Sequence, residues 1–161
     1  MTPTPFDDHV AFEQRWGRVT PDERHSLADA DPLLFVADHI STHDRRVGSL
    51  ALCMLPVGSP PTLAVIPDGP PLPRDEDCLM LLGNVAELMG ANLRGLGVVH
   101  HRLGSTEITD VDRRWALALR ASSLALGFDA IGVLARLYTG EIVRVGIPDV
   151  LPADYLSTVS R

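Results

Sequence analysis

The chain has 161 residues, of which 45% are hydrophobic and 22% charged, a composition typical of one globular domain with a sizeable core. Its net charge of -7 argues against nucleic-acid binding, which depends on clustered basic residues, and the absence of lysine excludes a P-loop, a pyridoxal phosphate enzyme and a lysine nucleophile. No apolar stretch is long enough for a bilayer and the N-terminus lacks a secretory signal pattern, so we expect a cytoplasmic protein without a membrane partner.

The first 18 residues are predicted to be a tail and a short amphipathic segment. Residues 1–8 are rich in proline, threonine and aspartate, and residues 9–16 offer Val10, Phe12 and Trp16 for packing. These side chains would cover either the chain's own sheet or a neighbouring molecule. We therefore expect a single α/β domain over residues 19–161, and a homodimer or another protein as its partner.

Helix and strand signals alternate in the first third of that domain. Thr20–Glu23 combines an N-cap, a proline and a glutamate three residues after the cap, which predicts a short helix ending near Asp31. The apolar run 33–40 fits a helix or a strand equally well. Residues 50–55 and 63–66 predict a hairpin, because the prolines and glycine between them block continuation of either strand.

Two long helices with broad apolar stripes are predicted next. The first opens at Pro73-Arg74, runs to about Met89, and its stripe comprises Cys78, Leu79, Leu82, Val85, Ala86 and Met89. The second covers about residues 110–126, and its stripe comprises Trp115, Leu119, Ser122 and Leu126. The apolar run 96–101 between them predicts a buried strand.

A second hairpin is predicted near the end of the chain. Residues 131–138 and 141–145 flank Thr139-Gly140, where glycine supplies the positive φ of a two-residue turn. The complete order of strands and helices predicts a single-domain α/β fold with a mixed β-sheet and flanking helices. Cys53 and Cys78 lack metal-ligand or paired spacing, so we expect two reduced thiols in the core.

A cluster of residues that can bind a metal ion is predicted where the strand 96–101 ends. His100 and His101 close that strand, and a turn leads to Thr109 and Asp112 at the start of the next helix. Imidazole and carboxylate are ordinary zinc ligands, and a catalytic zinc site has three protein ligands and one open position. These residues therefore indicate a cleft with a candidate Zn²⁺ site, in which His101 and Asp112 are the metal ligands.

The spacing of these residues resembles the metal motif of the JAB (MPN, JAMM) metalloproteases and of RadC-like proteins. In that motif His-x-His is followed after seven residues by Ser-x-x-Asp. With His101 as the second histidine, Thr109 matches the serine and Asp112 matches the aspartate, whereas the first histidine falls on Val99. The resemblance covers roughly residues 50–146 and implies a RadC/JAB-like fold with the element order of cytidine deaminases.

The departures from the motif decide what the resemblance implies about activity. Residues 102–104 keep only the glycine of the His-Pro-Ser-Gly run usual in RadC-like chains. Because valine cannot coordinate a metal, Val99 implies a domain that has lost catalysis and serves as a binding or scaffolding module without a cofactor. The alternative is a zinc-dependent peptidase or isopeptidase with an atypical ligand set. Its third ligand would be another histidine: His39, His43 or His100.

The same residues also fit purely structural roles. Thr109 before an apolar-periodic run is a plain N-cap, and Asp110 and Asp112 face the positive end of the helix dipole. His100 and His101 would then be a strand-end pair, one of them buried and hydrogen-bonded. Adjacent strand residues point to opposite faces, so the two histidines cannot join one site without a bulge.

Overall fold

The computed structural model describes residues 31–39, 47–59, 61–66 and 69–159. Within these ranges, five strands form one sheet in the order β2-β1-β3-β4-β5. The strands are Leu50–Pro56 (β1), Thr62–Ile66 (β2), Leu93–Arg102 (β3), Asp129–Leu137 (β4) and Ile142–Val145 (β5). The expected tail, amphipathic segment and short helix before residue 31 lie outside the described residues.

The sheet is mixed, as the sequence predicts. β1 pairs antiparallel with β2 and β3, β3 pairs parallel with β4, and β4 pairs antiparallel with β5. Parallel neighbours need a crossover, which α5 (Asp110–Leu126) supplies between β3 and β4. Both predicted hairpins, β1–β2 and β4–β5, are confirmed by these pairings.

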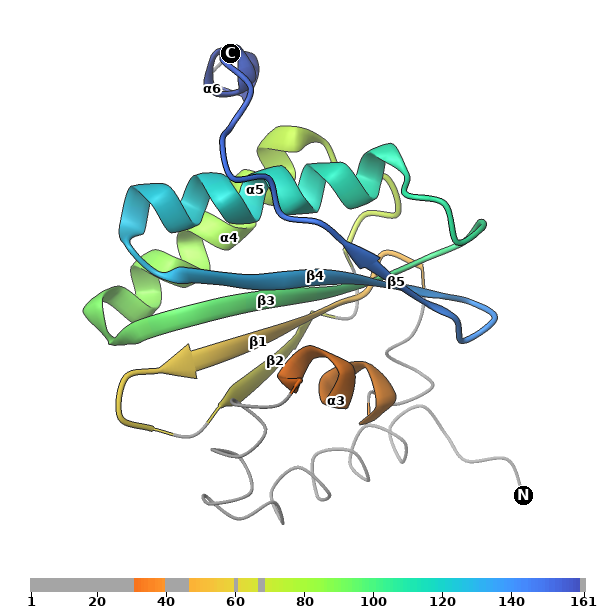
Figure 1. Cartoon of the computed structure of the whole chain (residues 1–161), viewed down its shortest axis with the longest axis horizontal. Helices are drawn as coiled ribbons and strands as arrows, with labels where there is room; N and C mark the ends of the chain where they lie inside the picture. The colour runs from red at the N-terminus through yellow and green to blue at the C-terminus, as the bar shows by residue number, and fades with distance from the viewer. Residues whose placement is uncertain (1–30, 40–46, 60, 67–68, 160–161) are drawn as a thin grey trace.

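Helices cover both faces of the sheet, which gives three layers (Figure 1). α4 (Asp75–Met89) and α5 pack on one face, and α3 (Pro32–His39) lies on the other. The short α6 (Tyr155–Val159) contacts α4 near the end of the chain. The run that fits either a helix or a strand by sequence is thus helical. No helix among the described residues combines the length and apolar character needed to cross a bilayer.

The core beneath α4 and α5 is built from the predicted helix stripes except for Leu126, which is 45% exposed near the end of α5 and lies outside the core. Its fully buried members include Leu52, Leu82, Leu96, Val98 and Leu119. A second cluster on the opposite face joins α3 to the sheet and contains Val36, Cys53, Val99 and Leu134. Cys53 and Cys78 are both buried free thiols, as expected, and they belong to different clusters.

β3 is buried on both faces, and its alternation determines where the strand-end residues point. Leu96 and Val98 belong to the cluster under α4 and α5, whereas Val99 belongs to the cluster under α3. Because successive side chains alternate, His100 continues the first series and His101 the second. The two histidines therefore lie in different layers of the fold.

The seat of α3 depends on a glycine in the middle of β3. A Cβ atom built on Gly97 would lie 2.5 Å from Cδ2 of Leu33, which is far inside van der Waals contact. The absence of a side chain at Gly97 lets the buried Leu33 pack directly on the strand backbone. At the start of α3, the Leu34 amide donates to Oδ1 of Asp31 at 3.1 Å.

The start of α5 is fixed by a reciprocal capping interaction. The Asp112 amide donates to Thr109 Oγ1 at 3.2 Å, and the Thr109 amide donates to Asp112 Oδ2 at 3.0 Å. This is the capping-box geometry, here with aspartate in place of the more usual glutamate. The helix ends at Gly127, whose φ of 78° is the left-handed conformation that glycine adopts without strain. The predicted helix start at Thr109 is therefore confirmed.

Candidate functional site

A buried polar cluster joins the end of β3 to the start of α5. Asp112 is completely buried, and His100 and Arg102 are each about as buried, with exposed fractions of 4% and 6%. His100 and Arg102 are two residues apart on β3, so their side chains share the sheet face that α5 covers. Asp112 in the first turn of α5 meets both of them.

Arg102 uses its whole guanidinium group within this cluster. Nε donates to Asp112 Oδ1 and Nη2 to Asp112 Oδ2, each at 2.9 Å, which is a bidentate pairing. The remaining hydrogens go to backbone carbonyls of the following turn: Leu103, Ser105 and Glu107. All five guanidinium hydrogens therefore have acceptors. Arg102 therefore holds the loop 103–107 through its backbone carbonyls and links this loop to α5 through Asp112.

The Asp112 carboxylate is held in its charged form. Burial alone would raise its pKa, but the polar contacts with His100, Arg102 and the Thr109 backbone outweigh this effect and keep the pKa below its ordinary value. One carboxylate therefore serves both as a helix cap and as the counter-ion of a buried arginine. Its two oxygens are occupied by these contacts before any ligand is considered.

His100 completes the cluster from the other side. Its Nε2 lies 2.7 Å from Asp112 Oδ1, and its ring centroid lies 6.4 Å from that of Trp115 on α5. The contact has the distance of an ion pair but not the geometry of a hydrogen bond, and Nε2 is buried. The carboxylate oxygens take their side-chain hydrogen bonds from Arg102, and the imidazole lies beside them.

The predicted pairing of His101 with Asp112 does not occur and is corrected by the structure. His101 points to the α3 side of the sheet, where its Nδ1 lies 3.0 Å from Oγ of the buried Ser49. Strand alternation places it there, because its neighbour His100 takes the face toward α5. Val99, assigned to the first histidine position, also faces α3 and packs in the apolar cluster there.

The structure brings together some of the predicted site residues and separates others. His100, Thr109 and Asp112 meet in one cluster, whereas His101 does not join them. The Thr109 hydroxyl is committed to capping α5. In the part of the chain that the structure describes, no group of three or more histidine, cysteine, aspartate or glutamate residues could hold a metal ion. His43 and the side chain of His39 lie outside the described residues.

Arg102 is the residue that reasoning from sequence left out of the site. A signal for it was available, because the strand period of two places residue 102 on the same face as residue 100. The predicted cleft is also filled differently from expectation, since Arg102 occupies the space between the strand end and α5. A cavity of about 290 Å³ contains Trp115 but none of the three charged residues of the cluster, and its walls are mostly apolar residues such as Leu50, Ile66 and Leu81, with Asp77 among them.

The chemistry available to this cluster is restricted by its composition. A guanidinium offers positive charge and donors but no lone pair, and it stays protonated in proteins, so it neither coordinates a metal nor accepts a proton. No family model matches the chain, and no curated protein and no solved structure shows a significant similarity to it. Its function is therefore inferred from the residues and geometry of the site.

Proposed function

We propose that this protein is a catalytically inactive RadC/JAB-like binding or scaffolding module. The proposal starts from the register of the motif at the end of β3. When the motif is placed one residue later than the sequence suggested and the loop is one residue shorter, its two histidine positions fall on His100 and Arg102. Thr109 and Asp112 keep the serine and aspartate positions. These four residues are the ones that meet in the buried cluster.

The observation that carries the proposal is the bidentate contact of Arg102 with Asp112. In an active site of this class a metal ion would supply the positive charge beside the aspartate and activate a water molecule. Here the guanidinium supplies the charge, and it takes both carboxylate oxygens. It has no open coordination position, so it cannot generate a metal-bound nucleophile. The cluster stabilises the loop and the helix start instead of performing hydrolysis.

A binding role is supported by the apolar side chains that this end of the sheet exposes. Leu103 and Ile108, in the loop tied down by Arg102, are 62% and 42% exposed, and Tyr138 is 81% exposed. The Tyr138 amide donates to the Arg102 carbonyl, which brings the two segments together. An ordered loop with exposed apolar side chains is a suitable contact surface for another protein.

The test of lost catalysis is metal analysis of protein purified without a histidine tag. We expect zinc far below one ion per chain, unchanged in Asp112→Asn, because Arg102 occupies both oxygens of Asp112. Stoichiometric zinc that disappears in His100→Ala and Asp112→Ala would contradict the proposal and support the zinc-dependent hydrolase instead. Arg113→Gln, an exposed arginine at the start of the same helix, is the control for nonspecific effects.

The binding surface is tested separately by crosslinking and light scattering of purified protein. A Leu103→Asp, Tyr138→Asp variant should lose any self-association or partner complex that the native chain forms. Leu88→Asp is the matched control, because Leu88 is 88% exposed on α4 and belongs to another surface. Equal loss of complexes in the control and in the test variant would remove this surface from the proposal.

A further inference from the structure

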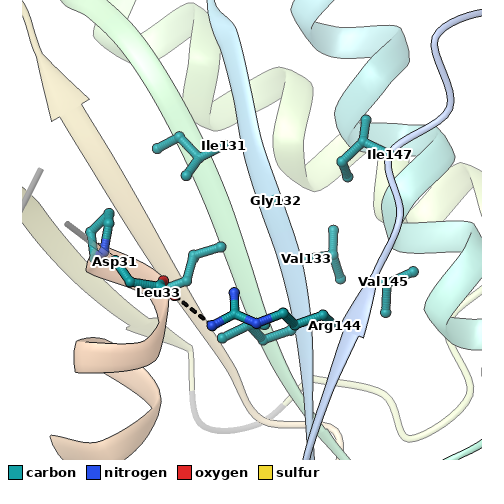
Figure 2. Close-up of a pocket in the computed structure, with 10 residues that line it drawn as sticks. Asp31, Leu33, Ile131, Gly132, Val133, Arg144, Val145 and Ile147 are labelled. Carbon is teal, nitrogen blue, oxygen red and sulfur yellow. Dashed lines mark hydrogen bonds and ion pairs between the residues drawn. The ribbon is translucent and has the colours of Figure 1, made fainter. Parts of the chain in front are cut away.

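A second cavity lies at the other end of the parallel strands, where β5 separates from β4 (Figure 2). Its volume is about 440 Å³, and its walls are the start of α3, the first half of β4 and the end of β5. It is distant from the carboxyl ends of β3 and β4, so what it binds does not depend on the proposed function. Its size is within the range of about 300 to 1,000 Å³ found for small-molecule sites.

The cavity exists because β5 pairs with only part of β4. The pairing begins at Val133 with Val145, although β4 starts at Asp129. Beyond Val145 the chain turns toward α5, where Arg120 Nε donates to the Pro148 carbonyl at 2.6 Å. Gly132 has no side chain to fill the resulting wedge. The opening is therefore a product of the fold around these strands.

The lining combines an aliphatic wall with one pair of opposite charges. The apolar part comprises Pro32, Leu33, Ile131, Val133, Leu134, Val145 and Ile147. Leu33, Ile131 and Leu134 belong to the cluster under α3, and Val133, Val145 and Ile147 to the cluster under α4 and α5. Figure 2 shows Arg144 reaching from β5 toward the start of α3, where its Nη2 lies 2.5 Å from Oδ2 of Asp31. These two side chains are 61% and 37% exposed, so they form the rim and remain reachable from solvent.

Both charged groups keep hydrogen-bonding capacity beyond their mutual contact. A guanidinium has five hydrogens, and the contacts of Arg144 among the described residues use one of them, at Nη2. The Asp31 carboxylate accepts that hydrogen on Oδ2 and the Leu34 amide on Oδ1, which leaves a lone pair on each oxygen. An incoming carboxylate can therefore bind Arg144 and an incoming ammonium can bind Asp31 while the ion pair stays intact.

We propose that this cavity binds a free α-amino acid with a branched aliphatic side chain. The ammonium and carboxylate of such a ligand are on one carbon atom, which matches an aspartate and an arginine that touch each other. Its side chain would lie against Leu33 and Ile131, on the α3 face that Arg144 shares through its pairing with Leu134. A ligand with only a carboxylate would place a second negative charge beside Asp31. A ligand with only an amine would place a second positive charge beside Arg144.

The proposal is tested by titrating the ¹⁵N-labelled full chain with leucine and recording amide spectra. We expect saturable shifts of the Leu33, Ile131 and Gly132 amides. The compounds 4-methylpentanoate, isoamylamine and glycine lack the ammonium, the carboxylate and the side chain respectively, and each should bind at least about tenfold more weakly. Absence of saturable shifts with leucine at millimolar concentration would overturn the proposal, and so would 4-methylpentanoate binding as tightly as leucine.

Variants at the rim locate the site. Arg144→Gln and Asp31→Asn should each weaken leucine binding at least about tenfold, since each removes one charge partner. Asparagine is as good an N-cap as aspartate, so the second change preserves the start of α3. Arg113→Gln is the matched control, because Arg113 is 60% exposed and pairs with Asp110 in the same way. Unchanged leucine affinity in Arg144→Gln would show that the amino acid binds elsewhere.

Discussion

Arg102→Met is the change that tests most directly whether the buried cluster holds this fold together. Methionine preserves much of the arginine's apolar stem but removes the charge and all five donors. It leaves the Asp112 carboxylate with no exposed surface and no cationic partner, apart from the contact with His100. It also leaves the carbonyls of Leu103, Ser105 and Glu107 without their donor.

The size of the effect follows from the burial of both partners. Breaking a buried ion pair by removing one member costs about 3 to 5 kcal/mol, because the remaining charge stays desolvated. The three loop carbonyls add little, since the loop residues are exposed and water can replace the lost donor. For a domain of this size, about 2 to 4 °C of melting temperature corresponds to each kcal/mol, so we expect a drop of roughly 6 to 20 °C.

Urea unfolding followed by circular dichroism measures this cost, and a double-mutant cycle assigns it. Asp112→Asn alone and combined with Arg102→Met should give a coupling free energy of about 1 to 3 kcal/mol, as expected for residues in direct contact. Arg113→Met is the control, because its exposed pair with Asp110 should contribute less than about 1 kcal/mol. A cost below about 1 kcal/mol for Arg102→Met, or zero coupling with Asp112, would refute the central role of this pair.

Four further outcomes are expected. The pKa of Asp112 is lower in the folded state than its unfolded value of about 3.9, so its stabilising contribution is complete above that pH and is lost as the pH falls below it. The free energy of unfolding should therefore fall less steeply below about pH 4 in Asp112→Asn than in the native protein. Gly97→Ala should lower the free energy of unfolding in urea by about 1 to 3 kcal/mol, and adding Leu33→Ala to the same chain should recover part of this loss. If the two substitutions lower the free energy of unfolding additively, the close packing of α3 on β3 is contradicted. Burial raises the pKa of Cys53 to about 12, so a thiol reagent at neutral pH should label it only at the rate of unfolding, and rapid labelling of folded protein would contradict its burial. Arg102→His should increase zinc binding measured by competition with a chromophoric chelator by at least about tenfold, and unchanged affinity in a folded variant would count against its position in the motif.

The local elements of this fold were predictable because their signals are local. Pro73 and the apolar spacing after it define α4, and Thr139-Gly140 defines the turn between β4 and β5. The pairing of β1 with β3 has no such signal, since it joins residues 37 to 50 positions apart along the chain, from Pro56 with Leu93 to Leu50 with His100. The run 33–40 was ambiguous for a related reason, as only the contact of Leu33 with Gly97 shows which surface it covers.

The candidate site was predictable in part, and its limits have a physical cause. The roles of Thr109 and Asp112 at the helix start follow from their own spacing, so the capping interaction could be expected. Which histidine joins Asp112 depends on the absolute phase of β3, and alternation alone does not say which face lies under α5. Arg102 was overlooked because a motif of metal ligands directs attention to histidines, whereas a guanidinium can supply the same charge.

A side-chain cation controls the shape of the loop at this end of the molecule. A loop organised around bound zinc opens when a chelator removes the ion, and its conformation varies with metal supply. The loop 103–107 is organised around a guanidinium that is covalently part of the chain. The cation that shapes this loop is therefore inherited with the polypeptide and is present in every copy of it.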